Sequence, residues 1–484
     1  MTACGRHTWG YEQFGVKAII RCMRSSLALL LAPLIATAQP LAPHQRLAYD
    51  IYKELVEINT VTTTGDTAKA AEAMGSRLRA AGFAADEVRV FTPAPRKGNL
   101  VARLRGTGAK KPILLLAHID VVEAKREDWS MDPFKLEEKD GYFYGRGTGD
   151  DKFMAAAFVA NLIRYRQEGY RPERDIIVAL STDEEIGDAN ALGIRWLIAN
   201  QRNLIDAEFA LNEGAGVGLK NGKPIRNGVQ ASEKNYVDYS LEVKNAGGHS
   251  SLPRKDNAIY RLAEGLARLG KYDFPIRLDE TTRAWFARAA PFEEPQTAAD
   301  MKALAADRAD AAAIARLSAK PPYNAQMRTT CVATTLSGGH APNALPQLAR
   351  ANVNCRVLPG EPIAEVTATL KRVLADDAIE VKPAGDFGSA GPSPLRPDIL
   401  QPIEKLTAQF WPGIPVIPTM STGATDSRFL RAIGIPAYGH SGLAGDIDDN
   451  RAHGRDERVP VKSFYDGLEY LYRLVKMLSG PSAP

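Results

Sequence analysis

The sequence has little net charge, no long apolar run and no internal repeat or low-complexity tract. Without the first 38 residues, which hold four basic residues and one acidic residue, 61 − 4 = 57 Lys and Arg face 57 − 1 = 56 Asp and Glu. This near balance gives no reason to expect a nucleic-acid or membrane-surface partner. A composition of 45% hydrophobic and 24% charged residues excludes a disordered or fibrous protein, and 484 residues suffice for two or more domains.

An apolar segment near the N-terminus is too short for a membrane span. Residues 27–35 are apolar, follow Arg21 and Arg24, and end at the small residues 36–38. This pattern predicts a signal peptide over residues 1–38, cleaved after Ala38, and therefore a secreted or periplasmic protein. A bilayer requires about 20 apolar residues, so a permanent anchor is the less favoured alternative. Met23 is the expected true start, because the residues before it do not belong to such a signal.

Only two cysteines, Cys331 and Cys355, follow that segment. If the stretches around them form a hairpin closed near residues 338–346, the two thiols lie opposite one another, and a cross-strand disulfide could form in an oxidising compartment. Two buried free thiols are more frequent for such residues, and the sequence favours this interpretation.

Polar side chains follow three short apolar runs at the points where the runs end. Residues 113–117, 176–180 and 209–211 are continuously apolar, which is typical of strands buried on both faces of a parallel sheet. The carboxyl ends of such strands form one ligand-binding edge. The residues expected to share this edge, together with a glycine-rich loop at residues 145–149, are His118, Asp120, Asp150, Glu184, Glu185 and Glu213.

This collection is strongly acidic. Clustered carboxylates at low dielectric repel one another and must take up protons unless a cation neutralises them. Asp150 alone could simply cap the helix that follows it. The whole set, however, predicts a metal centre.

The sequence predicts one α/β domain that is interrupted by an inserted domain of a different class. From Asn235 onward apolar and polar residues alternate, as in an antiparallel strand with one solvated face. A helical tract at 278–322, further alternating segments at 329–336 and 349–358, and a helix at 363–374 follow. We interpret residues 235–388 as an α+β insertion. The two parts of the α/β domain, which has a mostly parallel sheet, are then residues 43–234 and 389–480.

Seven short motifs occur in an order typical of one family. They are HIDVV at 118–122, GRGTGDDK at 145–152, DEEIG at 183–187, NEG at 212–214, GHSS at 248–251, GHAPN at 339–343 and HGRDE at 453–457. With these motifs the chain resembles the M20 family of dinuclear zinc peptidases and amidohydrolases. The resemblance runs through nearly all of the chain after residue 38. It implies a zinc-peptidase-like catalytic domain interrupted by a lid and dimerisation domain, and a homodimer.

The same resemblance implies a pair of divalent metal ions. His118 and Glu213 would bind one ion, Glu185 and His453 the other, and Asp150 would bridge them. Nitrogen and oxygen ligands without thiolate suit zinc, although cobalt or manganese could occupy the same set.

By the same resemblance, two carboxylates would support the ligands. Asp120 would hydrogen-bond the second ring nitrogen of His118 and fix its tautomer. Glu184, next to a ligand but not itself one, would be the general base for a metal-activated water.

The resemblance also implies the substrate contacts. His249 would stabilise the oxyanion of the scissile carbonyl, often in the neighbouring subunit's site. Asn343 and Arg356 would hold a free substrate carboxylate, for which the guanidinium fork is suited, and Gly423 could add a backbone N–H. Glu123, in place of a common proline, and Phe153, in place of a common glycine, depart from the pattern and affect the expected pocket mouth.

The expected function is an exported carboxypeptidase or dipeptidase that cleaves the amide bond of small peptides with a free C-terminal carboxylate. The alternative is an N-acyl-amino-acid amidohydrolase, which needs the same carboxylate contacts and a more apolar acyl pocket. A binding protein that has lost turnover is a third possibility, against which the intact Glu184 argues.

Overall fold

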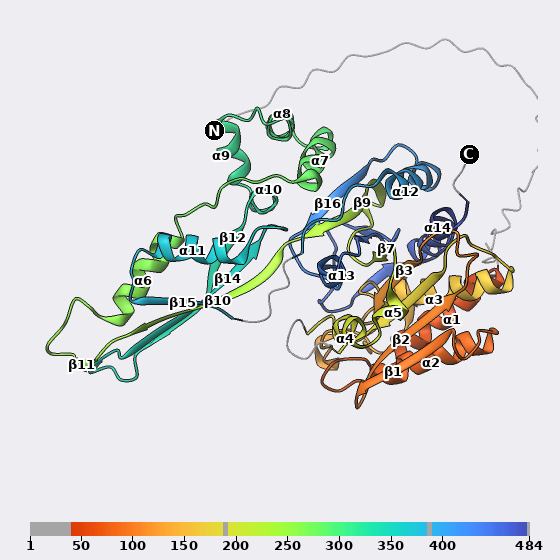
Figure 1. The fold of residues 1–484 in the computed structure, drawn as a ribbon, viewed down its shortest axis with the longest axis horizontal. Coiled ribbons are helices and arrows are strands. Elements are labelled where there is room, and N and C mark those ends of the chain that lie inside the picture. The colour runs from red at the N-terminus through yellow and green to blue at the C-terminus, as the bar shows by residue number, and fades with distance from the viewer. Residues whose placement is uncertain (1–39, 187–191, 385–389, 482–484) are drawn as a thin grey trace, which may run out of the picture. The chain divides into compact units, whose positions relative to one another are not determined.

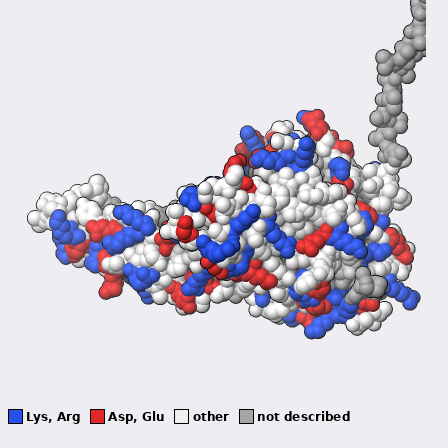
Figure 2. All heavy atoms as spheres, turned by 90° about the horizontal axis from the view of Figure 1, so that it is seen from above, with Lys and Arg blue, Asp and Glu red and all other residues white. Residues whose placement is uncertain are grey.

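The computed structural model describes residues 40–186, 192–384 and 390–481 (Figure 1). The predicted signal peptide with its cleavage site at Ala38 lies outside these ranges, as does the predicted boundary at residue 388. Within them, no helix combines the length and apolar character needed to cross a bilayer. Figure 2 shows basic and acidic side chains interspersed on the face drawn, the distribution expected of a nearly neutral chain.

A ten-stranded sheet forms the centre of the α/β part. Its strands are β1 (Val88–Ala94), β2 (Lys97–Leu104), β3 (Ile113–His118), β6 (Ile176–Ser181), β7 (Phe209–Asn212), β8 (Val217–Lys220), β9 (Lys223–Glu233), β16 (Val416–Ser421), β17 (Ala437–Gly439) and β18 (Ala444–Asp446). The order is β1-β2-β6-β3-β7-β17-β9-β8-β18, with β16 paired to β9. The middle pairs β6–β3, β3–β7 and β7–β17 are parallel, which confirms the predicted α/β class.

Both faces of this sheet are covered by helices, as alternate residues of β3 show. Leu115 and Ala117 belong to one apolar core, whereas Leu114 and Leu116 belong to another. The helices of the first core are α1 (Pro43–Glu57), α2 (Thr67–Ala80), α3 (Lys152–Gln167), α12 (Pro397–Phe410) and α14 (Val461–Ser479). Those of the second are α4 (Ile194–Asn200), α5 (Arg202–Ile205) and α13 (Ser427–Ala432). Each fully buried leucine of β3 contributes about 1.5–3 kcal/mol, which explains the unbroken apolar run.

The inserted segment builds a second sheet of opposite character. Its strands are β10 (Asn235–Lys244), β12 (Thr330–Gly338), β14 (Leu348–Val357) and β15 (Ile379–Ala384), all antiparallel in the order β12-β14-β10-β15. Val237, Tyr239 and Leu241 are fully buried against α6 (Ala258–Leu269) and α11 (Ile363–Leu374). The predicted strand at 235 and the predicted helix at 363–374 are therefore confirmed.

The helices between α6 and β12 in the chain do not pack on this second sheet but on the central one. They are α7 (Glu280–Ala289), η2 (Ala290–Phe292), α8 (Pro295–Ala305), α9 (Ala311–Ser318) and α10 (Pro321–Met327). Phe286, Met301 and Leu317 share an apolar core with Ile417 of β16. This tract thus packs on a strand of the central sheet, and the boundaries 43–234, 235–388 and 389–480 stay a prediction.

Cys331 and Cys355 form a disulfide. The antiparallel pairing of β12 with β14 places these two residues directly opposite one another. The interpretation as free buried thiols is therefore wrong, because the strand register brings the two side chains together.

Two small sheets complete the fold. One contains β4 (Glu137–Lys139), β5 (Tyr142–Tyr144) and β19 (Arg458–Pro460), and the other β11 (Gly248–His249) and β13 (Ala344–Leu345). A 3-10 turn, η1, covers Arg126–Asp128. In the first small sheet Arg458 pairs with Tyr144, so the loop after β5 lies beside the loop before β19.

Candidate metal centre

Two histidines and three carboxylates converge at the carboxyl edge of the central strands. They form two sets, His118 with Asp150 and Glu213, and Asp150 with Glu185 and His453, and in each set the candidate ligand atoms all lie within 4.8 Å of one another. Nε2 of His118 is 3.0 Å from Oδ1 of Asp150. Nε2 of His453 is 3.2 Å from Oδ2 of Asp150 and 3.0 Å from Oε2 of Glu185. Asp150 thus faces both sets, one through each carboxylate oxygen.

Strand order explains this convergence. His118 ends β3, and Glu185 and Glu213 follow its two parallel neighbours β6 and β7. Asp150 comes from the loop between β5 and α3, and His453 from the loop between β18 and β19. The pairing of β5 with β19 brings these last two loops together, although about three hundred residues separate them.

A buried carboxylate that the sequence did not assign, Glu457, holds the two loops in contact. Its side chain is 2% exposed and accepts hydrogen bonds from Nη1 of Arg146 at 2.7 Å and from the backbone N–H groups of Gly147, Gly149 and Asp150 at 3.0, 2.7 and 3.2 Å. Arg146 also donates to the carbonyl of Gly454 at 2.8 Å. Asp150 is thereby fixed relative to the loop that carries His453. The signal was present, since Glu457 closes the HGRDE motif.

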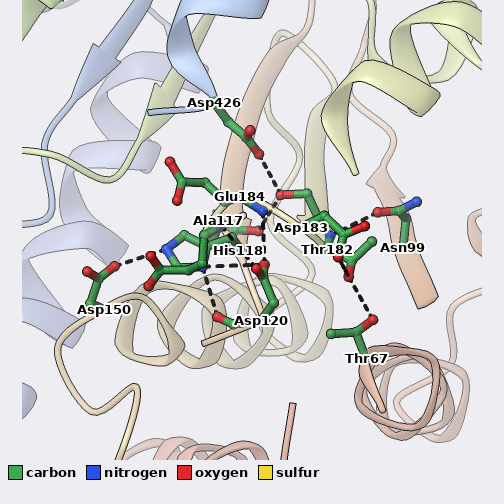
Figure 3. A network of polar contacts seen from close by, with 12 residues as sticks. Thr67, Asn99, Ala117, His118, Asp120, Asp150, Thr182, Asp183, Glu184 and Asp426 are labelled. Atoms are coloured by element: carbon green, nitrogen blue, oxygen red, sulfur yellow. Dashed lines mark hydrogen bonds and ion pairs between the residues drawn. The ribbon is translucent and has the colours of Figure 1, made fainter. Parts of the chain in front are cut away.

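Asp120 hydrogen-bonds the second ring nitrogen of His118 as predicted, but through its backbone. Its backbone carbonyl accepts a 3.0 Å hydrogen bond from Nδ1 of His118, while its carboxylate lies 3.7 Å from that nitrogen. The carboxylate instead accepts the backbone N–H groups of Glu184 and Glu185 at 3.2 and 3.1 Å (Figure 3). Asp120 therefore orients the His118 ring so that Nε2 faces Asp150, and it fixes the turn that carries Glu184 and Glu185.

The electrostatics show that the cluster needs cations or protons. Burial, together with neighbouring carboxylates, raises the pKa of Glu184 and of Glu213 well above the usual range. Burial alone would raise the pKa of Asp150, but hydrogen bonds from His118 and His453 hold this pKa below its usual value. Beside it, Oδ2 of the buried Asp151 has no hydrogen-bond partner in the described part of the chain. Imidazole and carboxylate donors gathered around uncompensated charge fit a pair of divalent ions.

The histidine pKa values predict how metal binding depends on pH. In the metal-free protein, hydrogen bonds to Asp150 and Glu185 raise the pKa of His453 to about 10. Burial lowers the pKa of His118, but the carboxylates of Asp120 and Asp150 outweigh burial and raise this pKa above its usual value. A metal ion must displace these protons, so zinc affinity is expected to rise as pH increases toward the pKa of His453. Calorimetry of the metal-free protein in buffers of different ionisation enthalpy should show proton release. A pH-independent affinity would contradict this.

A further buried carboxylate, Asp426, lies above the same cluster (Figure 3). Ser181 Oγ, at the end of β6, donates a 2.9 Å hydrogen bond to Oδ2 of Asp426. Burial raises the pKa of Asp426 to about 7. It lies between β16 and α13, and the sequence analysis assigns it no role.

The predicted substrate residues fall into two separate pairs. His249 in β11 pairs with Ala344 of β13, and Ser250 N–H donates to the carbonyl of Asn343 at 3.1 Å, so His249 and Asn343 are neighbours. Nη1 of Arg356 donates to the carbonyl of Thr422 at 3.3 Å, next to Gly423, so Arg356 and Gly423 are neighbours.

Asn343 and Arg356 do not meet within one chain. The β14 strand starts at Leu348, and Arg356 is 356 − 348 = 8 residues along it, which corresponds to about 26 Å. Asn343 lies beyond the start of this strand, where the β11–β13 pair continues the hairpin. Within one chain the two residues are therefore apart, and their assignment as a pair that binds the substrate carboxylate stays a prediction.

The two departures from the family pattern have different positions. Phe153 is fully buried and packs against Phe464, with ring centroids 5.7 Å apart, so it does not shape the pocket mouth. Glu123 is exposed and accepts a hydrogen bond from the Thr63 hydroxyl.

An α/β sheet with two sets of histidine and carboxylate side chains at its strand ends, which share Asp150, is the arrangement expected of a metal-dependent hydrolase. Residues 114–477 match the model of "Peptidase family M20/M25/M40", and the chain belongs to this family of metallopeptidase hydrolases. The family includes dinuclear metal-binding peptidases.

The comparisons with individual proteins agree with this. The chain is 30% identical over 389 residues to "Probable carboxypeptidase S-like 2" of Dictyostelium discoideum, covering 76% of this chain and 71% of that protein. It is 29% identical over 374 residues to human "N-fatty-acyl-amino acid synthase/hydrolase PM20D1", covering 76% and 74%. The M20 family metallo-carboxypeptidase Sso-CP2 from Sulfolobus solfataricus shares the fold, with a TM-score of 0.66 at 19% identity over 90% of this chain and 99% of that one.

Proposed function

We propose that this protein hydrolyses the amide bond that joins an acyl group to an amino acid with a free carboxylate, as a carboxypeptidase or dipeptidase. The observation that carries the proposal is Asp150, whose two oxygens face two separate sets of candidate ligands. Relatives named as carboxypeptidases support the same reaction.

The ligand atoms divide naturally between two ions. His118 and Glu213 would hold one, Glu185 and His453 the other, and Asp150 both. Zinc suits this donor set best, with cobalt or manganese as alternatives. When bound, such a pair activates a water molecule and polarises the scissile carbonyl.

Glu184 moves the proton in this proposal. Its backbone is held by Asp120, and its side chain is half-buried beside the ligands. Burial and the neighbouring carboxylates raise the pKa of its carboxyl in the metal-free protein, and two bound cations would favour the ionised form that can accept a proton. It takes a proton from the attacking water and delivers it to the leaving amine nitrogen, a role that typically contributes about 10²–10⁴-fold.

The carboxylate of the substrate would be bound by Arg356 together with the backbone N–H of Gly423. Arg356 stacks over the ring of Tyr236 at 4.6 Å and reaches the carbonyl of Thr422, so its guanidinium is held beside this loop. Burial and nearby positive charge lower the pKa of Arg356. The usual pKa of arginine is so high that Arg356 stays a cation at neutral pH.

We propose a homodimer in which the partner supplies His249 and Asn343. These residues lie on a hairpin about 26 Å or more along the sheet from Arg356, which supports a site shared between two subunits. An edge strand is available for pairing, since β12 ends the inserted sheet and exposes Val332 and Leu336 by 61% and 62%.

The dimer is tested by charging this edge. The double change Val332→Lys and Leu336→Lys is expected to give a monomer in light scattering and to lower kcat/KM at least tenfold. The reason is that the lysines on β12 of one copy would repel those on β12 of the other. Phe292→Lys, at another exposed apolar side chain, is the matched control and should stay dimeric. A fully active monomer would contradict the shared site.

A second candidate, an N-acyl-amino-acid amidohydrolase, is favoured by the similarity to PM20D1. We expect the zinc-loaded enzyme to hydrolyse substrates with a free carboxylate and to reject the corresponding methyl esters or amides. A panel of free dipeptides, N-blocked dipeptides and N-acyl amino acids separates the two candidates. Activity on acyl amides alone would reject the peptidase, and activity on none would reject the whole proposal.

We also propose export, supported by the Cys331–Cys355 disulfide, since such bonds persist in oxidising compartments. Mature protein that begins upstream of Gln39 would contradict cleavage after Ala38.

A further inference from the structure

Asp426 is buried near the candidate metal centre, yet it belongs to neither ligand set and is not the proposed base. It is 6% exposed, and its Oδ2 accepts the 2.9 Å hydrogen bond from the hydroxyl of Ser181, which is fully buried (Figure 3). Ser181 is the last residue of β6, three residues before Glu184. Asp426 is therefore bonded to the end of the strand that leads to the base.

The next residue, Ser427, is bonded to a second strand end. Its hydroxyl oxygen accepts a 3.0 Å hydrogen bond from Nδ2 of Asn212, and both side chains are buried. Asn212 is the last residue of β7 and directly precedes the candidate ligand Glu213. Since β6 and β7 are the two parallel neighbours of β3, two consecutive residues hold the strand ends on both sides of His118.

The segment 422–427 reaches the carboxylate-binding residue at its other end. The carbonyl of Thr422 accepts the hydrogen bond from Nη1 of Arg356 at 3.3 Å. Between the two ends, the hydroxyl of Thr425 donates a 2.8 Å hydrogen bond to Glu233, which is 2% exposed and forms a 2.6 Å ion pair with Arg431. The segment is thus held at its beginning, its middle and its end, and it connects Arg356 with the strand ends.

This connection fixes a distance that the reaction depends on. A substrate whose carboxylate is bound at Arg356 must place its scissile carbonyl at the metal ligands. A misplacement of about 1 Å can lower the rate about 100-fold. One extra methylene between the amide nitrogen and the carboxylate lengthens the substrate by about 1 Å or more. A rigid connection therefore distinguishes substrates by the spacing of these two groups.

We propose that Asp426 is a positioning residue that, through Ser181, fixes the spacing between the carboxylate-binding loop and the metal ligands. It thereby makes the enzyme selective for amides of α-amino acids over those of β-amino acids. This inference rests on the proposed hydrolysis of amides with a free carboxylate. Asp426 acts through the protein and does not touch the reacting atoms.

The substrate test compares glycine with β-alanine, which differ by one methylene. The full-length zinc-loaded protein is assayed with N-acetylglycine against N-acetyl-β-alanine, and with alanylglycine against alanyl-β-alanine. We expect kcat/KM to be at least about tenfold higher for the glycine member of each pair that is cleaved. Hydrolysis without this preference overturns the inference and leaves the hydrolase intact. Absence of hydrolysis here and across dipeptides and N-acyl amino acids overturns the proposed function itself.

Two variants remove the same hydrogen bond from opposite sides. Asp426→Ala leaves the buried Ser181 hydroxyl without its acceptor and should lower kcat/KM for the glycine substrate about tenfold or more. The ratio of glycine to β-alanine substrate should fall at least about threefold, while two metal ions are retained. Ser181→Ala should give the same changes, and the double variant no more than either single one. Ser181→Ala also keeps the test valid if Asp426→Ala misfolds.

A conservative variant and a matched control separate positioning from stability. Asp426→Asn keeps an oxygen that can accept from Ser181, so it should restore the glycine preference to within about threefold of the wild type. Ser393→Ala removes another buried hydroxyl, which donates to the carbonyl of Ala437 at 2.8 Å, and should leave the preference unchanged. An unchanged preference in both Asp426→Ala and Ser181→Ala would overturn the proposal. Loss of a metal ion in Asp426→Ala would also overturn it, because Asp426 would then be a ligand.

Discussion

Replacing Glu184 by Gln is expected to lower kcat by about 10²–10⁴-fold while the protein retains two metal ions. The amide keeps the size of the side chain but cannot accept a proton from water. The backbone N–H of Glu184 would still be held by Asp120, so the turn that carries Glu185 should not move. Steady-state kinetics and metal analysis of the same preparation measure both quantities.

The control for this change is Glu138→Gln, at an exposed carboxylate of β4, which should leave kcat unchanged. An unchanged rate in Glu184→Gln would remove the proton-transfer role. Loss of one metal ion together with the rate would instead mean that Glu184 is a ligand. The two outcomes are distinct, because a base and a ligand differ in whether metal content follows activity.

The strand-end half of the site could be predicted from residues alone. His118 and Glu213 follow continuous apolar runs, and in a parallel sheet such positions must share one edge. His453 could not be located in this way, since it reaches Asp150 only through the pairing of β5 with β19. Only the resemblance of its HGRDE motif to a family predicted that role.

Other features depended on registers and side-chain geometry that no sequence pattern contains. The disulfide follows from the residue-by-residue pairing of β12 with β14. The separation of Asn343 from Arg356 follows from the length of β14. The HGRDE motif contains Glu457, but not the burial of this carboxylate or its hydrogen bond from the backbone N–H of Asp150, both of which depend on the fold.

Asp150→Ala is expected to abolish detectable turnover and to weaken both metal ions, because its carboxylate faces both ligand sets. Loss of a supporting residue outside the ligand set typically costs about 10–100-fold in metal affinity, so loss of a shared ligand should exceed that range. The backbone N–H of Asp150 would still donate to Glu457, which keeps the loop in place. Metal analysis after dialysis against zinc buffers measures the stoichiometry directly.

The variant His453→Ala tests whether Asp150 binds both metal ions or only lies near the second one. His453 belongs to one ligand set only, so this variant should lose one metal ion and retain the ion held by His118, Asp150 and Glu213. Asp128→Ala, at an exposed carboxylate of η1, should keep both ions and full activity. If Asp150→Ala also retained one tightly bound ion, Asp150 would serve a single ion, and a water-activating pair bridged by this residue could not be the source of the activity.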